Sequence, residues 1–319
     1  MLKPTGGRLE SFNWTTTYIS AKPALVYRSL TSIGRMQVGG DSVAKVMGVI
    51  NVSPESFYKD SVRTSEDDIA SAARQMKRDG ANIIDIGAMS TAPYLDTIIS
   101  VEEEKRRLRM AVRVVKQACD LPVSVDTPRA EAAAEGIAAG ANAVNDVTGL
   151  KHDSKMAELV SDAQVPVIIG AYSAVPASGR ISATIKALKE SIALARKAGV
   201  KDSSMIIDPS IGFFRSEGKN PFFTKMTDVP WYVRDIEVLS DMKKLVALGK
   251  PVCVSASRKS FIGHLLNLPA ARDRLVPSVI CEAIAVLNGA SVIRTHSVLE
   301  TVQALTTLQL ISRQSSKRL

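Results

Sequence analysis

The segment VMGVINVSPESF, residues 46–57, changes abruptly from apolar to polar residues. Residues 46–50 have the composition of a buried strand, whereas residues 52–56 favour a turn. Asn51 stands at the junction, although asparagine is disfavoured in strands. Packing alone would not select this side chain. We therefore expect Asn51 either to fasten the loop to the end of the strand or to contact a bound molecule.

The same segment helps to distinguish between two fold classes that both alternate strands with helices. A doubly wound nucleotide-binding sheet carries a glycine-rich sequence, such as G-x-G-x-x-G, after its first strand. The corresponding residues here, 51–54, read Asn-Val-Ser-Pro and contain no glycine. The segment thus argues against the doubly wound sheet.

The pattern of an apolar run followed by a helical segment recurs along the chain. Strands are predicted at 46–51, 82–87, 122–126, 142–146, 165–170, 205–208, 251–256 and 291–294. Helices are predicted near 66–79, 101–118, 128–139, 153–162, 181–198, 235–248, 273–288 and 298–312, and a loop at 209–234. Eight alternating units over roughly 265 residues match an α/β fold of the (β/α)₈ TIM barrel type. We assign residues 45–319 to this barrel and residues 1–44 to an N-terminal extension packed on it.

The bulk composition is typical of a cytoplasmic protein that binds small molecules. Of the 319 residues, 45% are hydrophobic, which is enough for a large core. The three cysteines show no paired spacing, which favours a reducing compartment. The formal charge of +9 is spread along the chain and aromatics make up only 5%, so no nucleic acid is expected as a partner. No run is long enough to span a membrane. The charge instead suits small phosphorylated ligands.

Polar residues follow most of the predicted strands. In a (β/α)₈ barrel the carboxyl ends of the strands carry the active site. A single Asp or Asn at such a place often only caps the next helix, and we rate that explanation as about even for any one residue. Seven polar strand ends on one face make it a poor explanation. These residues are Asn51, Asp85, Asp126, Asn145 with Asp146, Asp208, Ser257 to Lys259, and Arg294 with His296.

The residue types form two groups around the predicted rim. Acids and an amide (Asp85, Asp126, Asn145, Asp208) suit a ligand rich in N–H donors and ring nitrogens. Cations (Arg258, Lys259, Arg294 and a protonated His296) suit a phosphate or another anion. Asn51 lies between the groups and could bind Mg²⁺ or a phosphate oxygen.

Six motifs on successive strands now carry a resemblance to a known family. MGVINVSPESF (47–57), VSVDT (123–127), NDVTG (145–149), DPSIGF (208–213), SRKSFIG (257–263) and RTH (294–296) resemble the motifs of dihydropteroate synthases, in the same order. The similarity spans residues 45–312. It implies a transferase that joins 6-hydroxymethyl-7,8-dihydropterin pyrophosphate to an arylamine, p-aminobenzoate, and releases pyrophosphate in folate biosynthesis.

The resemblance also implies roles for individual residues. Asp126, Asn145, Asp208 and Lys259 would hold the pterin. Asn51, Arg294 and His296 would hold the pyrophosphate with its Mg²⁺, which Asn51 ligates. Asn51, Lys259, Arg294 and His296 are the expected catalytic residues. The further expected substrate-binding residues are Asp85, Thr91, Phe213, Ser257 and Arg258. A homodimer is the family expectation.

Two loops depart from the family pattern, which leaves the acceptor open. The second loop usually reads S-T-R-P-G, but residues 90–94 read Ser-Thr-Ala-Pro-Tyr, so Ala92 replaces an arginine. Lys59 stands where the first loop usually has an acid. A phosphorylated ribosylaminobenzene, the acceptor of methanopterin biosynthesis, therefore competes with p-aminobenzoate as the expected acceptor. The resemblance is also compatible with a pterin-dependent methyltransferase and with an inactive pterin-binding relative.

Overall fold

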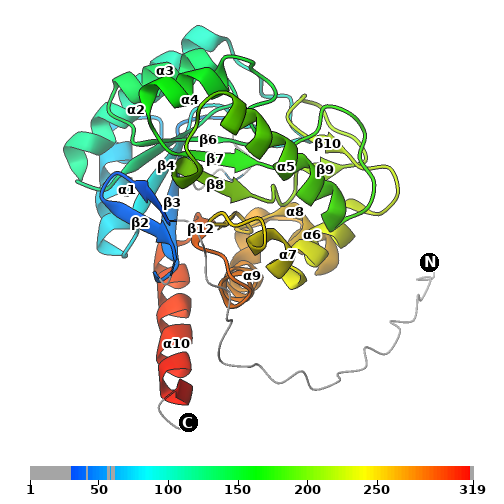
Figure 1. The fold of residues 1–319 in the computed structure, drawn as a ribbon. Helices are drawn as coiled ribbons and strands as arrows, with labels where there is room; N and C mark the ends of the chain where they lie inside the picture. The colour runs from blue at the N-terminus through cyan, green and yellow to red at the C-terminus, as the bar shows by residue number, and fades with distance from the viewer. Residues whose placement is uncertain (1–29, 41, 56–57, 59–61, 317–319) are drawn as a thin grey trace, which may run out of the picture.

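The protein is described here from a computed structural model, which places residues 30–40, 42–55, 58 and 62–316. Eight parallel strands form one sheet in the order β11-β12-β3-β4-β5-β6-β7-β8 (Figure 1). A parallel bridge between Ile207 and Val252 joins the two edges of this sheet, so the strands form a barrel. The predicted fold class is confirmed. The strands are β3 (Lys45–Asn51), β4 (Ile83–Gly87), β5 (Val123–Asp126), β6 (Ala143–Asp146), β7 (Val167–Gly170), β8 (Met205–Asp208), β11 (Cys253–Val254) and β12 (Val292–Thr295).

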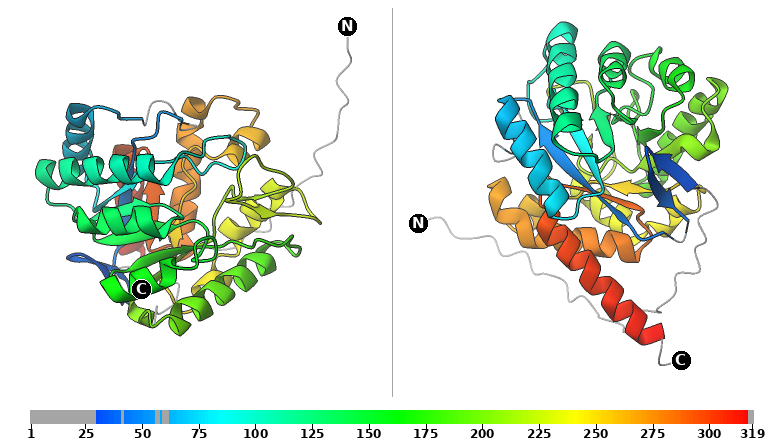
Figure 2. Two further views of the ribbon diagram at one scale, coloured as in Figure 1. Left: turned by 90° about the horizontal axis from the view of Figure 1, so that it is seen from above. Right: turned by 90° about the vertical axis from the view of Figure 1, so that its left-hand side faces the viewer.

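Helices surround the barrel, and the last one projects beyond its body (Figures 1 and 2). They are α1 (Glu66–Arg78), α2 (Val101–Ala118), α3 (Ala130–Ala138), α4 (Met156–Ala163), α5 (Ile181–Lys197), α6 (Trp231–Ser240), α7 (Lys243–Val246), α8 (Ser260–Leu265), α9 (Leu275–Leu287) and α10 (Val298–Ser316). Ser65 and Ser100 cap α1 and α2 by accepting hydrogen bonds from Asp68 N and Glu103 N. These caps explain why the sequence indicates both helix starts so clearly.

The structure differs from the sequence prediction after β8. The segment predicted as one loop, 209–234, contains two short parallel strands, β9 (Phe214–Arg215) and β10 (Thr224–Lys225). The helix predicted at 235–248 begins earlier, directly after Pro230, and is divided into α6 and α7. Proline suits a helix start because it has no N–H to leave unpaired. Two-residue strands give too short a pattern to be recognised from sequence.

The core has two parts, which is typical of a barrel. The larger part lies between the strands and the helices. The smaller part fills the barrel interior with Met47, Ile83, Ala143, Ile168, Ile206, Cys253 and Val292. Ile33 and Val38 complete this inner cluster, and both side chains are fully buried.

Ile33 and Val38 belong to a hairpin that covers the amino ends of the barrel strands. The hairpin pairs β1 (Leu30–Ile33) with β2 (Met36–Gly39). Thr31 Oγ1 donates to the carbonyl of Met205, the first residue of β8, over 3.2 Å. A Cβ atom added to Gly34 in the turn would lie 3.2 Å from Pro122 Cβ, just before β5. Residues 30–40 of the predicted N-terminal extension therefore pack on the barrel, while residues 1–29 and 41 lie outside the described residues.

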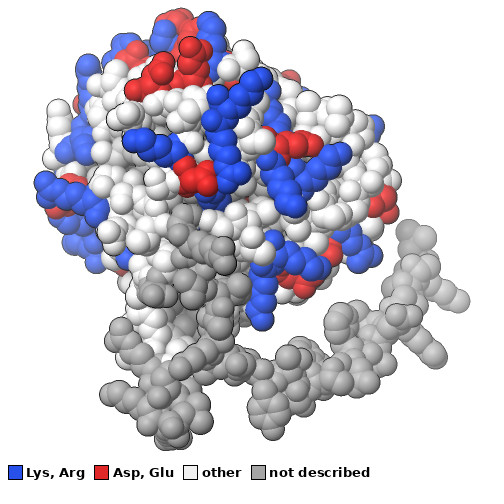
Figure 3. Space-filling view, viewed as in Figure 1, with Lys and Arg blue, Asp and Glu red and all other residues white. Residues whose placement is uncertain are grey.

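Two observations concern the surface. Basic and acidic side chains are interspersed on the face shown in Figure 3. Within the described residues, none of the helices has both the length and the apolar character needed to cross a membrane.

We predict that the hairpin stabilises the barrel by closing its interior. Ile33→Ala should lower the free energy of unfolding by about 2–5 kcal/mol, because it leaves a cavity in a fully buried cluster. Leu30→Ala is the matched control, since this hairpin residue is 49% exposed and should cost less than about 1 kcal/mol. Urea denaturation measures both. Equal losses in the two variants would show that the hairpin does not close the core.

Candidate active site

The carboxyl ends of the barrel strands surround a pocket. Nine residues predicted from the sequence line it together, although they come from seven different segments. They are Asn51, Thr91, Asp126, Asn145, Asp208, Phe213, Lys259, Arg294 and His296. The parallel barrel brings them together because every strand ends at the same rim.

Arg294 crosses the mouth of the barrel. It leaves β12, and its guanidinium Nε donates to Asp85 Oδ2 on β4 over 2.6 Å. Its Nη2 donates to Asp126 Oδ2 on β5, also over 2.6 Å. Asn145 Nδ2 adds a longer bond of 3.2 Å to Asp85 Oδ2. The predicted separation of acids from cations is therefore wrong at this point, because the length of the arginine side chain joins the two groups.

Burial changes the protonation of the groups at the mouth. It raises the pKa of Asp126 to about 7, a rise that Arg294 opposes and Asp85 reinforces. Burial also raises the pKa of Asp208, against the hydrogen bond from Ser210 N. Burial, aided by Arg294, lowers the pKa of Lys259 to about 8. The pocket thus contains both acceptors and donors whose charge can change near neutral pH.

His296 is neutral at physiological pH. Burial lowers the pKa of its imidazole to about 3, and the neighbouring charges of Arg294, Lys259 and Arg258 add to this effect. Its ring packs edge-on against Tyr58, with 5.4 Å between the ring centroids. The expectation of a protonated histidine at the phosphate end is therefore wrong. A neutral imidazole can still donate one N–H to an anion.

The loop that follows Asp208 is held by a buried ion pair from α6. Arg234 Nη1 donates to Ser210 O (3.1 Å) and to Asp235 Oδ1 (2.9 Å), and neither Arg234 nor Asp235 is exposed. Asp235 Oδ2 in turn accepts from Gly212 N over 2.9 Å. These bonds hold Ser210 at a φ of +54°, a conformation that costs a non-glycine residue about 1–2 kcal/mol. The loop places the ring of Phe213 beneath Lys259, with 4.5 Å between the ring centroid and Nζ.

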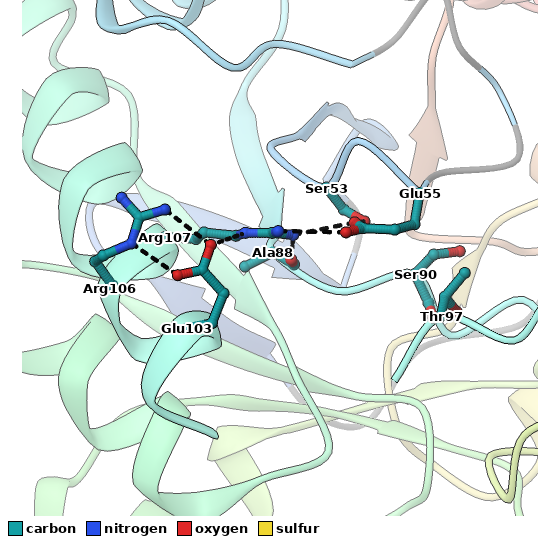
Figure 4. A network of polar contacts seen from close by, with 8 residues as sticks. All are labelled: Ser53, Glu55, Ala88, Ser90, Thr97, Glu103, Arg106 and Arg107. Atoms are coloured by element: carbon teal, nitrogen blue, oxygen red, sulfur yellow. Dashed lines mark hydrogen bonds and ion pairs between the residues drawn. The ribbon is translucent and has the colours of Figure 1, made fainter. Parts of the chain in front are cut away.

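A second network fixes the loops after β3 and β4 (Figure 4). Arg107 of α2 donates to both oxygens of Glu55, at 3.0 and 3.3 Å, and to the carbonyl of Ala88 at 3.1 Å. Ser53 Oγ also donates to Glu55, over 2.7 Å. Burial opposes the ionised form, but these hydrogen bonds outweigh it and lower the pKa of Glu55. The two loops are therefore joined by an ionised carboxylate.

Three predicted residues stand outside the pocket lining. Asp85 is fully buried behind Arg294. Ser257 Oγ accepts from His296 N over 3.2 Å and so supports that residue from behind. Arg258 donates to Arg272 O at 2.5 Å and to Ser297 Oγ at 2.9 Å. The structure gives Arg258 a role in fixing loops and does not bring it to the pocket.

Several lining residues were not predicted as site residues. They include Met89, Ser90, Pro93 and Val147, together with Gly170, Ser210 to Gly212, Ser255 and Ser260. Ala92 and Tyr94, of the loop that the resemblance places over the second substrate, line the pocket as well. Most lie in loops, and small or apolar loop residues carry no chemical signal. Ser260 could have been found, because it directly follows Lys259 in the same motif. Lys59 lies outside the described residues.

The surroundings of Asn51 bear on the Mg²⁺ expected there. The described residues contain no group of three His, Cys, Asp or Glu side chains that could hold a metal ion. Gly87, however, leaves a space between two hard oxygens. A Cβ atom there would lie 3.3 Å from Asn51 Oδ1 and 3.9 Å from Asp126 Oδ2. Asp126 Oδ2 already accepts a hydrogen bond from Arg294, so Asn51 Oδ1 is the oxygen of this pair that would ligate Mg²⁺. One such ligand fits Mg²⁺ that arrives with a phosphate, since Mg²⁺ needs few protein ligands in such complexes.

Comparison with known proteins agrees with this geometry. The family model of the pterin binding enzymes matches residues 47–296. A dihydropteroate synthase of Clostridium beijerinckii is 34% identical over 271 residues, which cover 84% of this chain and 94% of the relative. The dihydropteroate synthase of Bacillus subtilis is 33% identical, with coverage of 79% and 83%.

Solved structures show the same similarity. The dihydropteroate synthase of Xanthomonas albilineans with 4-aminobenzoic acid has a TM-score of 0.75 and 29% identity, covering 89% of this chain and 98% of its own. The enzyme of Coxiella burnetii in complex with pteroic acid has a TM-score of 0.73 and 30% identity, with coverage of 90% and 98%.

Proposed function

The chain belongs to the pterin binding enzymes and, within them, to the dihydropteroate synthases, and from this premise we propose how its pocket works. It is a transferase that condenses 6-hydroxymethyl-7,8-dihydropterin pyrophosphate with p-aminobenzoate in folate biosynthesis. We assign the reaction to this pocket because five residues line it together at the barrel mouth: Asp126, Asn145, Asp208, Lys259 and Arg294.

The pterin end is formed by acceptors on three strands. Asp126, Asn145 and Asp208 present carboxylate and amide oxygens to the pocket from β5, β6 and β8. A pterin offers an amino group and ring N–H groups, which such oxygens accept. Lys259 lies on the same pocket and supplies a donor for the ring oxygen or nitrogen. These contacts orient the methylene carbon that reacts.

The diphosphate end is formed by Arg294 with the neutral His296. In the reaction the arylamine nitrogen attacks the methylene carbon, a C–N bond forms, and the C–O bond to pyrophosphate breaks. The pyrophosphate takes the electron pair of the C–O bond, and the nitrogen releases one proton to solvent. Arg294 and the N–H of His296 stabilise the charge that develops on the leaving group. The amine is already nucleophilic, so a strong base is not required.

For the metal, we propose that Mg²⁺ binds with the diphosphate and that the oxygen of Asn51 ligates it. The space beside Gly87 supports this placement. When bound, Mg²⁺ would neutralise charge on the leaving pyrophosphate. Because His296 and Asn51 are both uncharged, an additional cation at this end would help to balance the charge of the diphosphate.

The competing functions are less well supported. The curated relatives are synthases, which favours condensation over methyl transfer. The methanopterin acceptor was inferred from Lys59, which lies outside the described residues, so that acceptor stays a prediction. A cytoplasmic location likewise stays a prediction.

For the assembly, we propose that a second copy of the chain covers one face of α9. Val276, Ile280 and Ile284 recur every four residues there and are 67%, 53% and 40% exposed. Leu310 and Ile311 of α10 are each 60% exposed as well. Apolar faces of this kind are typical of subunit interfaces. Sedimentation velocity tests the proposal, and a monomer at micromolar concentration would contradict it.

We predict that Asp126 and Asp208 are required for pterin binding. Asp126→Asn or Asp208→Asn should weaken it by about tenfold or more, because an N–H would then face an N–H of the ligand. Wild-type affinity should also fall as the pH drops through about 7, since Asp126 becomes protonated and loses acceptor capacity. In Asp126→Asn the fall in affinity through about pH 7 should be smaller, and the dependence that is left would come from Asp208 and Lys259. Calorimetry with a pterin analogue measures both effects.

The control for this experiment is Asp162→Asn, which changes an exposed acid of α4 and should bind normally. Product formation is followed in parallel by mass spectrometry and by pyrophosphate release. Unchanged pterin affinity in both site variants would show that the pterin binds elsewhere.

We predict that Asn51→Ala raises the Mg²⁺ concentration needed for half-maximal turnover several-fold, because one oxygen ligand is lost. Asn82→Ala is the matched control. Asn82 accepts a hydrogen bond from Val46 N at the opposite end of the barrel strands, so it should alter stability without altering the metal requirement. Full wild-type turnover in excess chelator would refute the metal proposal.

A further inference from the structure

Two loops meet across the mouth of the barrel. β4 and β8 stand on opposite sides of the eight-strand ring, four positions apart. Asn220, in the segment after β8, nevertheless donates through Nδ2 to the carbonyl of Ala92 after β4, over 2.7 Å. Lys219 N donates to Pro93 O over 2.6 Å. The segment 209–230 and the loop 88–99 therefore form a bridge over one side of the pocket.

Arg215 lies beneath this bridge, on β9. Its guanidinium carbon is 4.0 Å from the ring centroid of Trp231 and 5.2 Å from that of Tyr94. Its Nη1 donates to Ser260 Oγ over 3.2 Å. Tyr94 and Ser260 both line the pocket. Arg215 thus lies directly behind two lining residues, Tyr94 and Ser260, on the side of the cavity that carries Phe213 and Lys259.

Within the part of the chain that the structure describes, the guanidinium of Arg215 forms no ion pair, and Ser260 Oγ is its one hydrogen-bond acceptor. The carboxylate of Asp235 acts on it electrostatically but does not contact it. A half-buried cation without a contacting carboxylate is unfavourable, because the desolvation of its charge is only partly offset. Two aromatic faces offset part of this cost.

Neighbouring arginines show what a purely structural role looks like in this protein. Arg274, which also acts electrostatically on Tyr94, donates to the carbonyls of Leu268, Pro269 and Arg258. Arg234 forms the buried ion pair with Asp235. The donors of Arg274 and Arg234 are committed to loop carbonyls and a carboxylate. The donors of Arg215, apart from the one to Ser260, are not.

The hydrogen bond to Ser260 has a further consequence. Because Ser260 Oγ accepts from Arg215, its own O–H is directed away from the guanidinium and is available to a ligand in the pocket. The positive charge of Arg215 and the hydroxyl of Ser260 then act from the same side of the pocket. An anionic group on a ligand would contact the Ser260 hydroxyl and be attracted by the charge of Arg215 behind it, at a place separate from Arg294 and the diphosphate end.

We propose that Arg215, together with the Ser260 hydroxyl that it orients, determines the preference of this enzyme for an acceptor that carries an anionic substituent, the carboxylate of the arylamine. The inference rests on the proposed function, since it assigns the arylamine to the Phe213 side of the pocket.

The test compares acceptors of equal shape and different charge. Steady-state kinetics are measured with p-aminobenzoate and with neutral p-aminobenzamide, for the wild type and for Arg215→Gln. Glutamine can keep the hydrogen bond to Ser260 while the charge is removed. We expect the KM for p-aminobenzoate to rise about tenfold or more, from the loss of a charged interaction. The KM for p-aminobenzamide and that for the pterin substrate should change less than about twofold.

Lys225→Gln is the matched control, because this exposed cation lies on the paired strand β10 and should leave both acceptors unaffected. Arg215→Lys is a second variant, which keeps the charge and should retain most of the preference. Equal changes for the two acceptors in Arg215→Gln, or none, would overturn the inference and leave the synthase function intact. Absence of turnover in the wild type with either acceptor would instead overturn the proposed function itself.

Discussion

The structure of the site depends on one arginine, Arg294, which forms ion pairs with two carboxylates. Asp85 and Asp126 are held at the barrel mouth by the same Arg294 side chain, each over 2.6 Å. The two acids raise the pKa of Arg294, so it remains charged at any pH the enzyme meets. Removing one partner of such a buried pair typically costs about 3–5 kcal/mol, because the remaining charge is left without compensation. Arg294 is therefore required for the integrity of the mouth as well as for the chemistry that we assign to it.

The N-terminal hairpin and two further arginines support the barrel around that mouth. The hairpin covers the amino ends of the strands with Ile33 and Val38, and the pocket lies at the opposite end. On the carboxyl side, arginines fix individual loops: the buried Arg234 fixes the loop after β8, and the partly buried Arg107 fixes the loops after β3 and β4. Loops tied by several hydrogen bonds need little reordering when a substrate binds, which favours both affinity and rate. The loops after β3, β4 and β8 are thus tied at their bases, and those after β4 and β8 are also joined to each other across the pocket.

The sequence predicted the barrel and most of the pocket because both follow from short-range patterns. The bounds of α2 could be read from Ser100 and the acids of the first turn, and strand-end residues such as Asp126 and Asp208 converge by topology alone. Properties that depend on side-chain reach or burial could not be read. Arg294 was assigned to a cation group, yet its length carries it to the acids. His296 was expected to be charged, but burial beside three cations keeps it neutral. Arg258 and Lys259 are adjacent, and only the structure distinguishes the loop-fixing residue from the pocket residue.

The central claim is that Arg294 contacts the diphosphate in addition to ordering the acids that hold the pterin. Calorimetry with two ligands separates these roles: 6-hydroxymethyl-dihydropterin pyrophosphate and the same pterin without phosphate, each titrated into the wild type and into Arg294→Gln. We predict that Arg294→Gln weakens the phosphorylated ligand at least about tenfold more than the unphosphorylated one, because a charge-assisted contact is lost only with the former. An equal loss of affinity for both ligands would contradict this claim and would leave Arg294 with an ordering role alone.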